Sequence, residues 1–281
     1  MIKATVYLKR IVLVGILAAM AAPASAAMSP EMFLHDDNSD VTVDPFAGMT
    51  SWTVDGTDQL HRQWFWYRIG IEEEKPITLL DVNVIKESDT DNDGDSDVAY
   101  VEYGGTDFDV SVRVALDGGP AGSRMSDVAE QVTVINTSQT ESLDFHFYQY
   151  ADFDLGGTAA GDKVVHLGNG AQGSYTFDGE QVGDGWTLRV SEVATEPMAH
   201  CEANDENTLK TLLNDTDYTR DLNDDEQAGP GDVAWAYQWD FVLGPDEAFM
   251  LSKDKMITPE PATLALMGGG AVLVLFLRRR R

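Results

Sequence analysis

The stretch 108–116, FDVSVRVAL, sets five apolar side chains alternately against polar or small ones. An apolar residue at every second position is typical of a β-strand with one buried face, because successive side chains point to opposite sides of a sheet. A second stretch, 235–243, reads WAYQWDFVL and repeats the alternation with larger aromatic rings. We therefore expect both stretches to be strands in the core of a β-rich domain.

Less regular alternation extends through most of the chain between residues 27 and 257. Gly, Asp and Asn punctuate the gaps, as in the DGGP of 117–120 and the GDG of 183–185. Further strands are expected at 62–71, 77–87, 98–103, 128–136, 143–151, 163–167, 173–177 and 186–194. So many strands joined by short turns predict an all-β fold, a large antiparallel β-sandwich.

Helical periodicity is confined to 206–213, where Leu209, Leu212 and Leu213 would form one apolar edge. This short helix lies within 196–231, an acidic and irregular region that we interpret as an insertion between the last strands. A polar stretch at 35–40 opens the body and is expected to form a loop or a loose arm.

Charge separates the body from the two ends of the chain. The whole sequence has 19 Lys and Arg against 48 Asp and Glu, but seven of the bases and one acid lie in 1–26 and 258–281. The body, 27–257, therefore carries 12 bases and 47 acids. Repulsion excludes nucleic acid as a partner and disfavours an anionic membrane surface, whereas it favours solubility and cation binding.

A single cysteine, Cys201, leaves the fold without an intrachain disulfide, so the body must rest on its own hydrophobic core. A body of this length is large enough to bury such a core as one large domain or two small ones. Cys201 is interpreted as a lone thiol, with a link between two chains as the alternative.

The first 26 residues have the layout of a secretory signal peptide. Three bases, Lys3, Lys9 and Arg10, precede an apolar run at 11–22. Ala24 and Ala26 then supply the small side chains that signal peptidase needs, so cleavage is expected after residue 26 or 27. An uncleaved membrane helix is the alternative, although the run is short for a span of about 20 residues.

The last 24 residues combine three features in order. A Pro-Glu-Pro motif precedes an uncharged run at 262–277, and an arginine cluster ends the chain. The run is expected to form a transmembrane helix, and the arginines would hold the C-terminus in the cytoplasm and leave the body outside. The membrane contact would be through this tail alone. The sorting residues predicted here are Pro259, Glu260, Pro261, Arg278, Arg279, Arg280 and Arg281.

This tail resembles the PEP-CTERM sorting signal. The resemblance implies recognition by an exosortase, a membrane-embedded cysteine protease, and removal of the tail near the Pro-Glu-Pro. It also implies a Gram-negative host that makes exopolysaccharide or biofilm matrix. The protein would then be anchored transiently in the inner membrane and delivered to the cell surface or extracellular matrix. The resemblance is limited to 258–281 and implies nothing about the fold of the body.

An aspartate-rich stretch at 89–97, DTDNDGDSD, matches the first half of an Asp-x-Asp-x-Asp-Gly calcium loop. Alternating acids can direct several oxygens at one hard cation, and Gly94 stands where such a loop must bend. The twelfth position is Tyr100, which cannot supply the bidentate carboxylate of an EF-hand. A solvated turn is the alternative, since Asp, Asn and Gly favour turns. The predicted calcium ligands are Asp89, Asp91, Asp93, Asp95 and Asp97.

Catalytic signals are weak in the sequence. The five histidines have no metal-ligand spacing, and no Gly-x-Ser-x-Gly occurs. Asp152 and Asp154 could imitate the carboxylate pair of a glycosidase, but an acid-rich body produces such pairs by chance. Aromatic rows at 64–67 and 235–239 could stack sugar rings, although burial in the core is the commoner fate of such rows.

These observations predict an exported, non-catalytic protein of the cell surface or matrix, stabilised by calcium. A carbohydrate-binding module for exopolysaccharide is the first alternative, and a secreted hydrolase is the second. The positions of the aromatic rows decide the first alternative. The second requires convergent carboxyl groups or a histidine among polar side chains.

Overall fold

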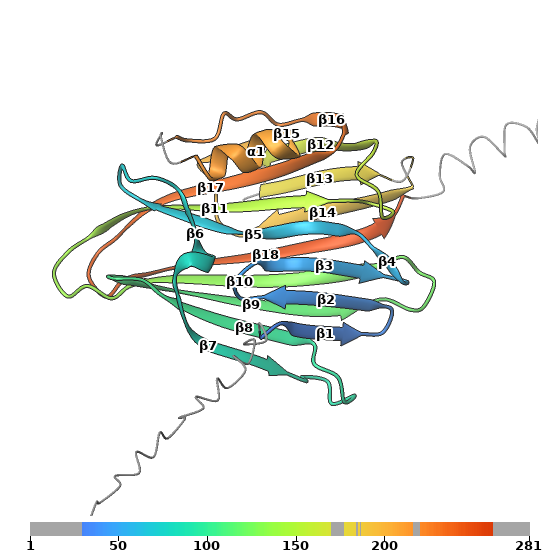
Figure 1. The fold of residues 1–281 in the computed structure, drawn as a ribbon, viewed down its shortest axis with the longest axis horizontal. Helices are drawn as coiled ribbons and strands as arrows, with labels where there is room; N and C mark the ends of the chain where they lie inside the picture. The colour runs from blue at the N-terminus through green and yellow to red at the C-terminus, as the bar shows by residue number, and fades with distance from the viewer. Residues whose placement is uncertain (1–29, 170–176, 184, 186, 216–219, 261–281) are drawn as a thin grey trace, which may run out of the picture.

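The computed structural model of the chain describes residues 30–169, 177–183, 185, 187–215 and 220–260. Within them the chain forms two antiparallel sheets stacked face to face (Figure 1), which confirms the predicted all-β sandwich. The predicted signal helix 1–26 and membrane helix 262–277 lie outside the described residues. Among the helices that are described, none combines the length and the apolar character needed to span a membrane.

Each sheet contains nine described strands. Sheet A has the order β1 (Met32–Asp36), β2 (Ser39–Asp44), β3 (Gly48–Val54), β5 (Leu60–Ile69), β11 (Leu143–Phe153), β17 (Val233–Leu243) and β15 (His200–Asp205), with β4 (Thr57–Asp58) on β3 and β6 (Lys75–Pro76) on β5. Sheet B has the order β16 (Ala228–Gly231), β12 (Asp162–Asn169), β13 (Phe177–Gly183), β14 (Leu188–Ala194), β18 (Ala248–Pro259), β10 (Ser126–Asn136), β9 (Phe108–Gly118), β8 (Val98–Gly104) and β7 (Asp81–Ser88). Many partners are far apart in sequence, so the topology brings distant residues together.

The alternation at 108–116 is confirmed as β9, whose five alternating large apolar side chains are at most 6% exposed. β17 departs from the predicted pattern, because Ala234, Ala236 and Gln238 are buried as well as the rings between them. The second face of β17 is covered by α1 (Glu206–Leu213) and the chain that follows it. There the backbone N–H of Leu222 donates to the Gln238 side chain at 3.0 Å.

Several strands were missed by the sequence pattern. The polar stretch 35–40, expected to be a loop or arm, belongs to the β1–β2 hairpin, where Asp37 adopts a positive φ of 48° at the turn. The insertion 196–231, expected to be irregular, contributes β15 and β16. β18 was not predicted at all, although it pairs with both β10 and β14 at the centre of sheet B. The strand expected at 173–177 falls almost entirely outside the described residues.

The predicted helix 206–213 is confirmed as α1. Asp205 caps it, since its side chain accepts a hydrogen bond from the Thr208 N–H at 3.3 Å. Leu209, Leu212 and Leu213 are buried, and the helix contacts β15 and β17 (Figure 1). α1 therefore covers the outer face of sheet A at its β17–β15 edge.

Aromatic side chains fill the space between the sheets. The rings of Phe65 and Phe147 stack with centroids 5.3 Å apart, as do those of Phe153 and Trp235. Trp239 is 1% exposed and so belongs to the same core. The row at 235–239 is therefore buried, and the sugar platform proposed for it is wrong. In the row at 64–67 the first three rings are buried, whereas Tyr67 is partly exposed.

Four charged side chains also lie between the sheets, each fully buried: Lys253 and Lys255 from β18, Glu130 from β10 and Glu192 from β14. The Lys253 ammonium is 2.7 Å from Glu130 and 3.2 Å from Glu192. Lys255 contacts both glutamates as well. Burial alone would raise the pKa of Glu130, but the two lysines lower it to about 2. These four residues form the buried charge network.

Candidate functional site

An unusual carboxyl lies at the C-terminal end of β11. Asp152 pairs with Arg62 of β5, and the register then shifts so that Phe153 pairs with Leu60. His61 is the extra residue of this bulge and is exposed. Because side chains alternate along β11, Asp152 points away from sheet B, toward the face on which α1 packs.

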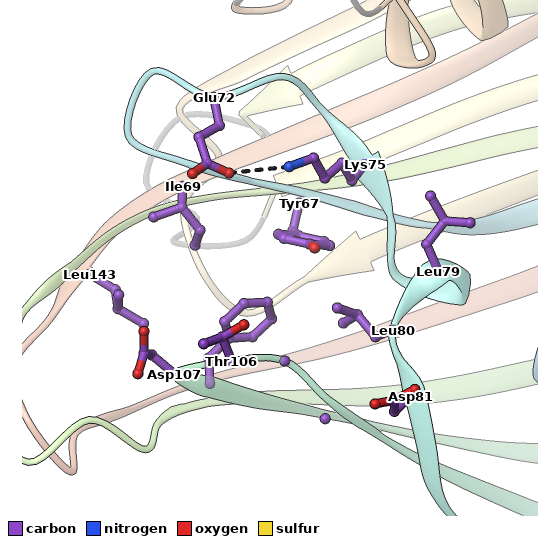
Figure 2. A pocket seen from close by; sticks show the side chains of 13 residues that line it. Tyr67, Ile69, Glu72, Lys75, Leu79, Leu80, Asp81, Thr106, Asp107 and Leu143 are labelled. Carbon is purple, nitrogen blue, oxygen red and sulfur yellow. Dashed lines mark hydrogen bonds and ion pairs between the residues drawn. The ribbon is translucent and has the colours of Figure 1, made fainter.

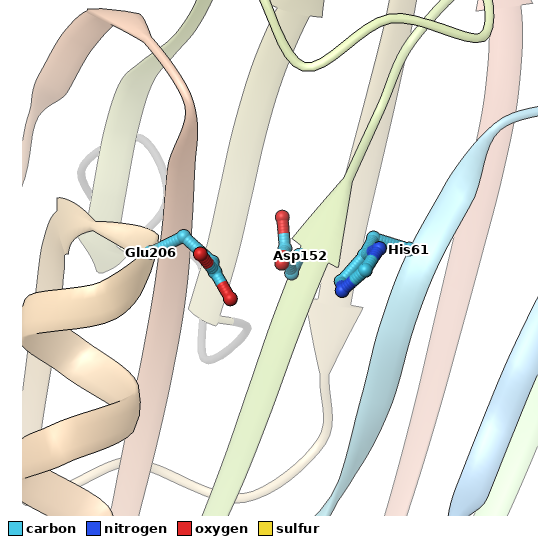
Figure 3. Close-up of side chains that lie close together, drawn as sticks. All are labelled: His61, Asp152 and Glu206. Atoms are coloured by element: carbon cyan, nitrogen blue, oxygen red, sulfur yellow. The ribbon is translucent and has the colours of Figure 1, made fainter.

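Three side chains from distant parts of the chain meet here (Figure 3). Single ligand atoms of His61, Asp152 and Glu206 all lie within 4.8 Å of one another. Glu206 is the first residue of α1 and is 8% exposed. Capping of α1 by Asp205 thus fixes the position of Glu206 over the end of β11.

Two further aspartates extend this group. Oxygens of Asp152, Asp154 and Asp232 also lie within 4.8 Å of one another. Asp154 directly follows β11, and its N–H donates to the Gln59 carbonyl at 3.0 Å. Asp232 links β16 to β17, and its carbonyl accepts from the Glu206 N–H at 3.3 Å. The five side chains His61, Asp152, Asp154, Glu206 and Asp232 are called the β11 acidic cluster below.

Asp152 is the least solvated member of the cluster. It is 1% exposed, and its Oδ2 accepts from the Tyr150 hydroxyl at 3.2 Å. Its Oδ1 has no hydrogen-bond partner among the residues that the structure describes. Arg62, its cross-strand neighbour, donates instead to the Ala47 carbonyl at 3.1 and 2.8 Å. The carboxyl is therefore buried with one oxygen unsatisfied.

Burial and like charge favour the neutral form of this carboxyl. Burial, followed by the negative charges of Asp154, Glu206 and Asp232, raises the pKa of Asp152 to about 8. Burial also raises the pKa of Asp154 and of Asp232, while His61 counteracts both shifts. Asp152 thus holds its proton up to a higher pH than an ordinary carboxyl does, beside three further carboxyl groups. That arrangement can donate and accept protons over a short distance.

The cluster could also hold a cation. An imidazole with two carboxylates, or three carboxylates, is a ligand set that divalent ions such as Zn²⁺ or Mn²⁺ accept. Asp152 is common to both triplets of the β11 acidic cluster. A bound ion and the proton on Asp152 would therefore exclude each other.

The predicted calcium loop has a different arrangement from the expected one. Asp89 accepts from the N–H groups of Asn92 and Gly94 at 2.6 and 3.1 Å, and Asp97 accepts from the Thr90 N–H at 2.8 Å. These carboxylates thus satisfy backbone donors of the turn. Asp91 and Asp93 accept from the N–H groups of Asp93 and Asp95.

A carboxylate outside the loop joins it. Oxygens of Asp91 and Asp93 lie within 4.8 Å of one from Asp36, at the end of β1. The sequence pattern missed Asp36, since only the fold brings β1 beside this loop. Calcium binding by residues 89–97 stays a prediction, now with Asp36 as an additional candidate ligand.

The first part of the sorting motif is attached to the body. Pro259 ends β18 opposite Leu188, and the Glu260 N–H donates to the Thr187 carbonyl at 2.9 Å. Arg189 donates to Glu260 Oε1 from Nε at 2.7 Å and also pairs with Glu180 at 2.7 Å. Sheet B therefore extends two residues beyond the predicted boundary at 257. Pro261, the four arginines, and Ala24 and Ala26 lie outside the described residues.

Comparison with known proteins identifies the tail. A family model of the PEP-CTERM protein-sorting motif matches residues 258–281. The resemblance found in the sequence is confirmed, and the motif supports an exported bacterial protein that is sorted by exosortase. No curated protein matches the chain.

Solved structures resemble the body in fold. A bacterial glucoamylase complexed with acarbose is similar with a TM-score of 0.54 and 7% identity, over 80% of this chain and 31% of the glucoamylase. The chain thus spans about a third of the length of that enzyme. A protein from Escherichia coli K12, assigned provisionally as an aldose 1-epimerase, has a TM-score of 0.50 and 10% identity, over 82% of this chain and 99% of its own. At these identities the likeness establishes the fold alone.

The prediction that the chain is not an enzyme is therefore wrong. It relied on the lack of sequence motifs, whereas the fold is one that carbohydrate-active enzymes use. The pair Asp152 and Asp154 was dismissed as a chance occurrence, yet it lies at the centre of the β11 acidic cluster. His61, Glu206 and Asp232 were missed because only strand pairing and the packing of α1 bring them to the end of β11.

Proposed function

We propose that the exported body is a carbohydrate-active enzyme that transfers protons at the anomeric centre of an aldose. The observation that carries the proposal is the Asp152 carboxyl, which is buried, has a pKa raised to about 8 and lies next to further carboxyl groups. Similarity in fold to a glucoamylase and to an assigned aldose 1-epimerase supports carbohydrate as the substrate class.

The reaction requires an acid and a base that act on one ring. Asp152 donates its proton to the ring oxygen while Asp154 or Asp232 removes the proton of the anomeric hydroxyl. The bond between the anomeric carbon and the ring oxygen breaks, its electron pair stays on the ring oxygen, and an open-chain aldehyde forms. Rotation and reversal of these transfers give the other anomer and regenerate both groups, so atoms and charges balance.

Spacing within the cluster favours this chemistry. The two oxygens that exchange protons are bonded to one carbon, so the acid and the base must lie close together. The oxygens of Asp152, Asp154 and Asp232 meet this requirement, since they lie within 4.8 Å of one another. Inverting glycosidases separate their carboxyls by about 6.5–9.5 Å and retaining ones by about 5–5.5 Å. A hydrolase is the second candidate, suggested by the similarity in fold to a glucoamylase.

The address of the protein bears on its substrate. We infer delivery through the sorting tail to the surface or matrix of a Gram-negative cell, where exopolysaccharide would supply the sugar. The proposal includes binding of exopolysaccharide and of calcium by the body. An exopolysaccharide would have to be neutral or cationic, because the body carries a large excess of acids.

Anomeric proton NMR of freshly dissolved α-D-glucose and α-D-galactose tests the proposal with the purified full chain. The parent should speed mutarotation above the buffer rate, and Asp152→Asn should lower kcat/KM by about 10²-fold or more. The rate should fall as pH rises through about 8, where Asp152 loses its proton. Asp127→Asn is the matched control. The pKa of Asp127 is also raised, to about 7, but this residue lies on β10, outside the cluster.

Three outcomes would overturn or redirect the proposal. Mutarotation at the buffer rate, together with no release of reducing ends from glycans, would exclude both candidate reactions. Release of reducing ends without mutarotation would favour the hydrolase. A rate that EDTA abolishes and Zn²⁺ or Mn²⁺ restores would show that the cluster holds a cation, and Asp152 would then not be the acid.

A further inference from the structure

A cavity of about 440 Å³ (Figure 2) opens near the start of β11, whereas the β11 acidic cluster lies at the end of that strand. It lies between the hairpin that joins β5 to β6 and the turn that joins β8 to β9. Small-molecule sites have volumes of roughly 300–1,000 Å³, so the cavity is large enough for one or two sugar rings. Tyr67, from the aromatic row at 64–67, is among the residues that line it, whereas none of the predicted calcium or sorting residues is.

The floor of the cavity is aromatic and apolar. The half-buried ring of Tyr67 lies 5.1 Å from that of Phe108, centroid to centroid, and 6.1 Å from that of Phe145. Leu80 and Leu143 complete the apolar lining (Figure 2). A fixed ring flanked by aliphatic groups suits the C–H face of a pyranose.

Glycine makes room for this floor. A Cβ placed on Gly105 would lie 2.6 Å from the Phe108 ring, closer than any real side chain allows. The missing side chain therefore lets Phe108 fold back against the β8–β9 turn, where the Gly105 N–H donates to the Phe108 carbonyl at 2.7 Å. Any larger residue at 105 would displace the ring.

Polar groups surround the apolar floor. Lys75, which pairs with Tyr67 across β5 and β6, has its ammonium 3.2 Å from the Glu72 carboxylate. Asp81 and Asp107 stand on opposite sides of the cavity (Figure 2). Carboxylates accept hydrogen bonds from hydroxyls and an ammonium donates to them. With three acids against one base, the lining disfavours an anionic ligand.

The cavity is separate from the β11 acidic cluster. Leu143 at the start of β11 lines the cavity, whereas Asp152 lies nine residues further along the same strand. At about 3.4 Å per residue, roughly 30 Å separates them. A single sugar ring cannot contact both.

We infer that this cavity is a second carbohydrate site, which binds a neutral pyranose through the Tyr67 ring and the surrounding polar groups. The Tyr67 ring faces the apolar side of the sugar, and Lys75, Asp81 and Asp107 form hydrogen bonds with the hydroxyl groups of the sugar. The site binds without catalysis, and it does not depend on the reaction proposed for Asp152. It anchors a glycan at one end of the body while the other end acts on sugar.

Saturation-transfer NMR on the full chain tests this inference with four methyl pyranosides: those of glucose, galactose, mannose and N-acetylglucosamine. Methyl glycosides cannot mutarotate, so the anomeric exchange proposed at Asp152 does not occur with them, and Asp152→Asn guards against hydrolysis. At least one should receive saturation from the parent and still receive it from Asp152→Asn. Tyr67→Ala should sharply lower the transfer, leaving only that to sugar bound at the β11 acidic cluster. Thr106→Trp, which fills the cavity from its exposed rim, should do the same without removing a packed ring.

The matched control is Tyr100→Ala. Tyr100 is likewise a partly exposed tyrosine near a lysine, with Lys86 Nζ 5.9 Å from its ring centroid, but it lies on β8 outside the cavity. Its loss should leave the transfer unchanged. Absence of transfer from all four sugars, or equal transfer in Thr106→Trp, would refute the second site. Loss of transfer in Asp152→Asn would place the bound sugar at the β11 acidic cluster and would equally overturn the inference.

Discussion

Two of the regions that bury charged side chains in this sandwich differ in one respect: the first is neutralised by its own members, and the second is not. The buried charge network places Lys253 and Lys255 against two glutamates between the sheets. The β11 acidic cluster places carboxyls together under the end of α1, and Arg62 beside it bonds a backbone carbonyl instead. Both regions are desolvated, but the first lowers the pKa of Glu130 and the second raises that of Asp152.

The difference teaches what each region is suited to do. A buried charge is tolerated when an opposite charge satisfies it, and such a pair chiefly fixes which strands meet. A buried carboxyl with an unsatisfied oxygen destabilises the fold, and such strain gathers at sites that act on a ligand. The network is therefore suited to fixing the architecture, and the cluster is the candidate for the proposed chemistry.

The largest expected effect comes from unbalancing the network. Lys255→Met should lower the free energy of unfolding by about 3–5 kcal/mol, because Glu130 and Glu192 then share one ammonium in the core. Urea denaturation measures the change, with Lys86→Met as the control, since a surface substitution should shift stability by less than about 0.5 kcal/mol. Equal losses in both variants would mean that the network is not a paired set and would remove the contrast.

Replacing the buried carboxyl of Asp152 should have a smaller effect on stability, and one that depends on pH. Because the folded state keeps a proton on Asp152 up to about pH 8, the parent loses stability as pH rises between its ordinary pKa and 8. Asp152→Asn lacks this titrating group. Its free energy of unfolding should therefore rise relative to that of the parent over the same pH range, by at most about 1.4 kcal/mol per pH unit. Urea melts at pH 5, 6.5 and 8 measure the difference. A constant difference would show that Asp152 titrates normally.

The network should respond to acid in the opposite sense. Glu130 has a lowered pKa, so its contribution is complete above its ordinary value and is lost as pH falls toward 2. Glu130→Gln should therefore be less stable than the parent at pH 6 and approach it at pH 2 to 3. Circular dichroism melts across that range test the sign. A gap that widens in acid would contradict the pairing with lysine.

The smallest effect concerns the exposed acids at 89–97, whose carboxylates already accept backbone hydrogen bonds. Weak calcium binding, in the range of about 10⁻⁴–10⁻³ M, should stabilise the fold by roughly 1.4 kcal/mol at a tenfold excess over the dissociation constant. Thermal melts with and without calcium measure this. Asp91→Ala and Asp36→Ala should remove the gain, and Asp144→Ala on β11 should keep it. An equal rise in all variants would mean general screening.

Sequence alternation predicted those strands whose inner face is purely apolar, such as β9. It failed for β18, where Leu251, Lys253, Lys255 and Ile257 all point inward. Two lysines at core positions contradict the rule that charge faces water, so the strand showed no readable period. Only their partners on β10 and β14 explain them, and those partners are more than 60 residues away.

The candidate site was predictable only in part for a similar reason. Asp152 and Asp154 are neighbours in sequence and could be noticed as a pair. His61 reaches them through a bulge in the pairing of β5 with β11, and Glu206 reaches them through the packing of α1 on β17. Neither contact is encoded by local spacing, so no motif search could assemble the cluster.

The hydrogen bonds that hold Glu260 to Arg189 set an orientation for the whole molecule. β18 and β11 point the same way in Figure 1, so the strand end at Pro259 and the end of β11 lie on one side of the body. While the predicted span 262–277 stays in a bilayer, only a few residues of chain would separate that side of the body from the lipid. The body would then be held with the β11 acidic cluster toward the membrane and the Tyr67 cavity toward the medium. Cleavage near Pro261 would release the body and make the end that carries the β11 acidic cluster accessible as well.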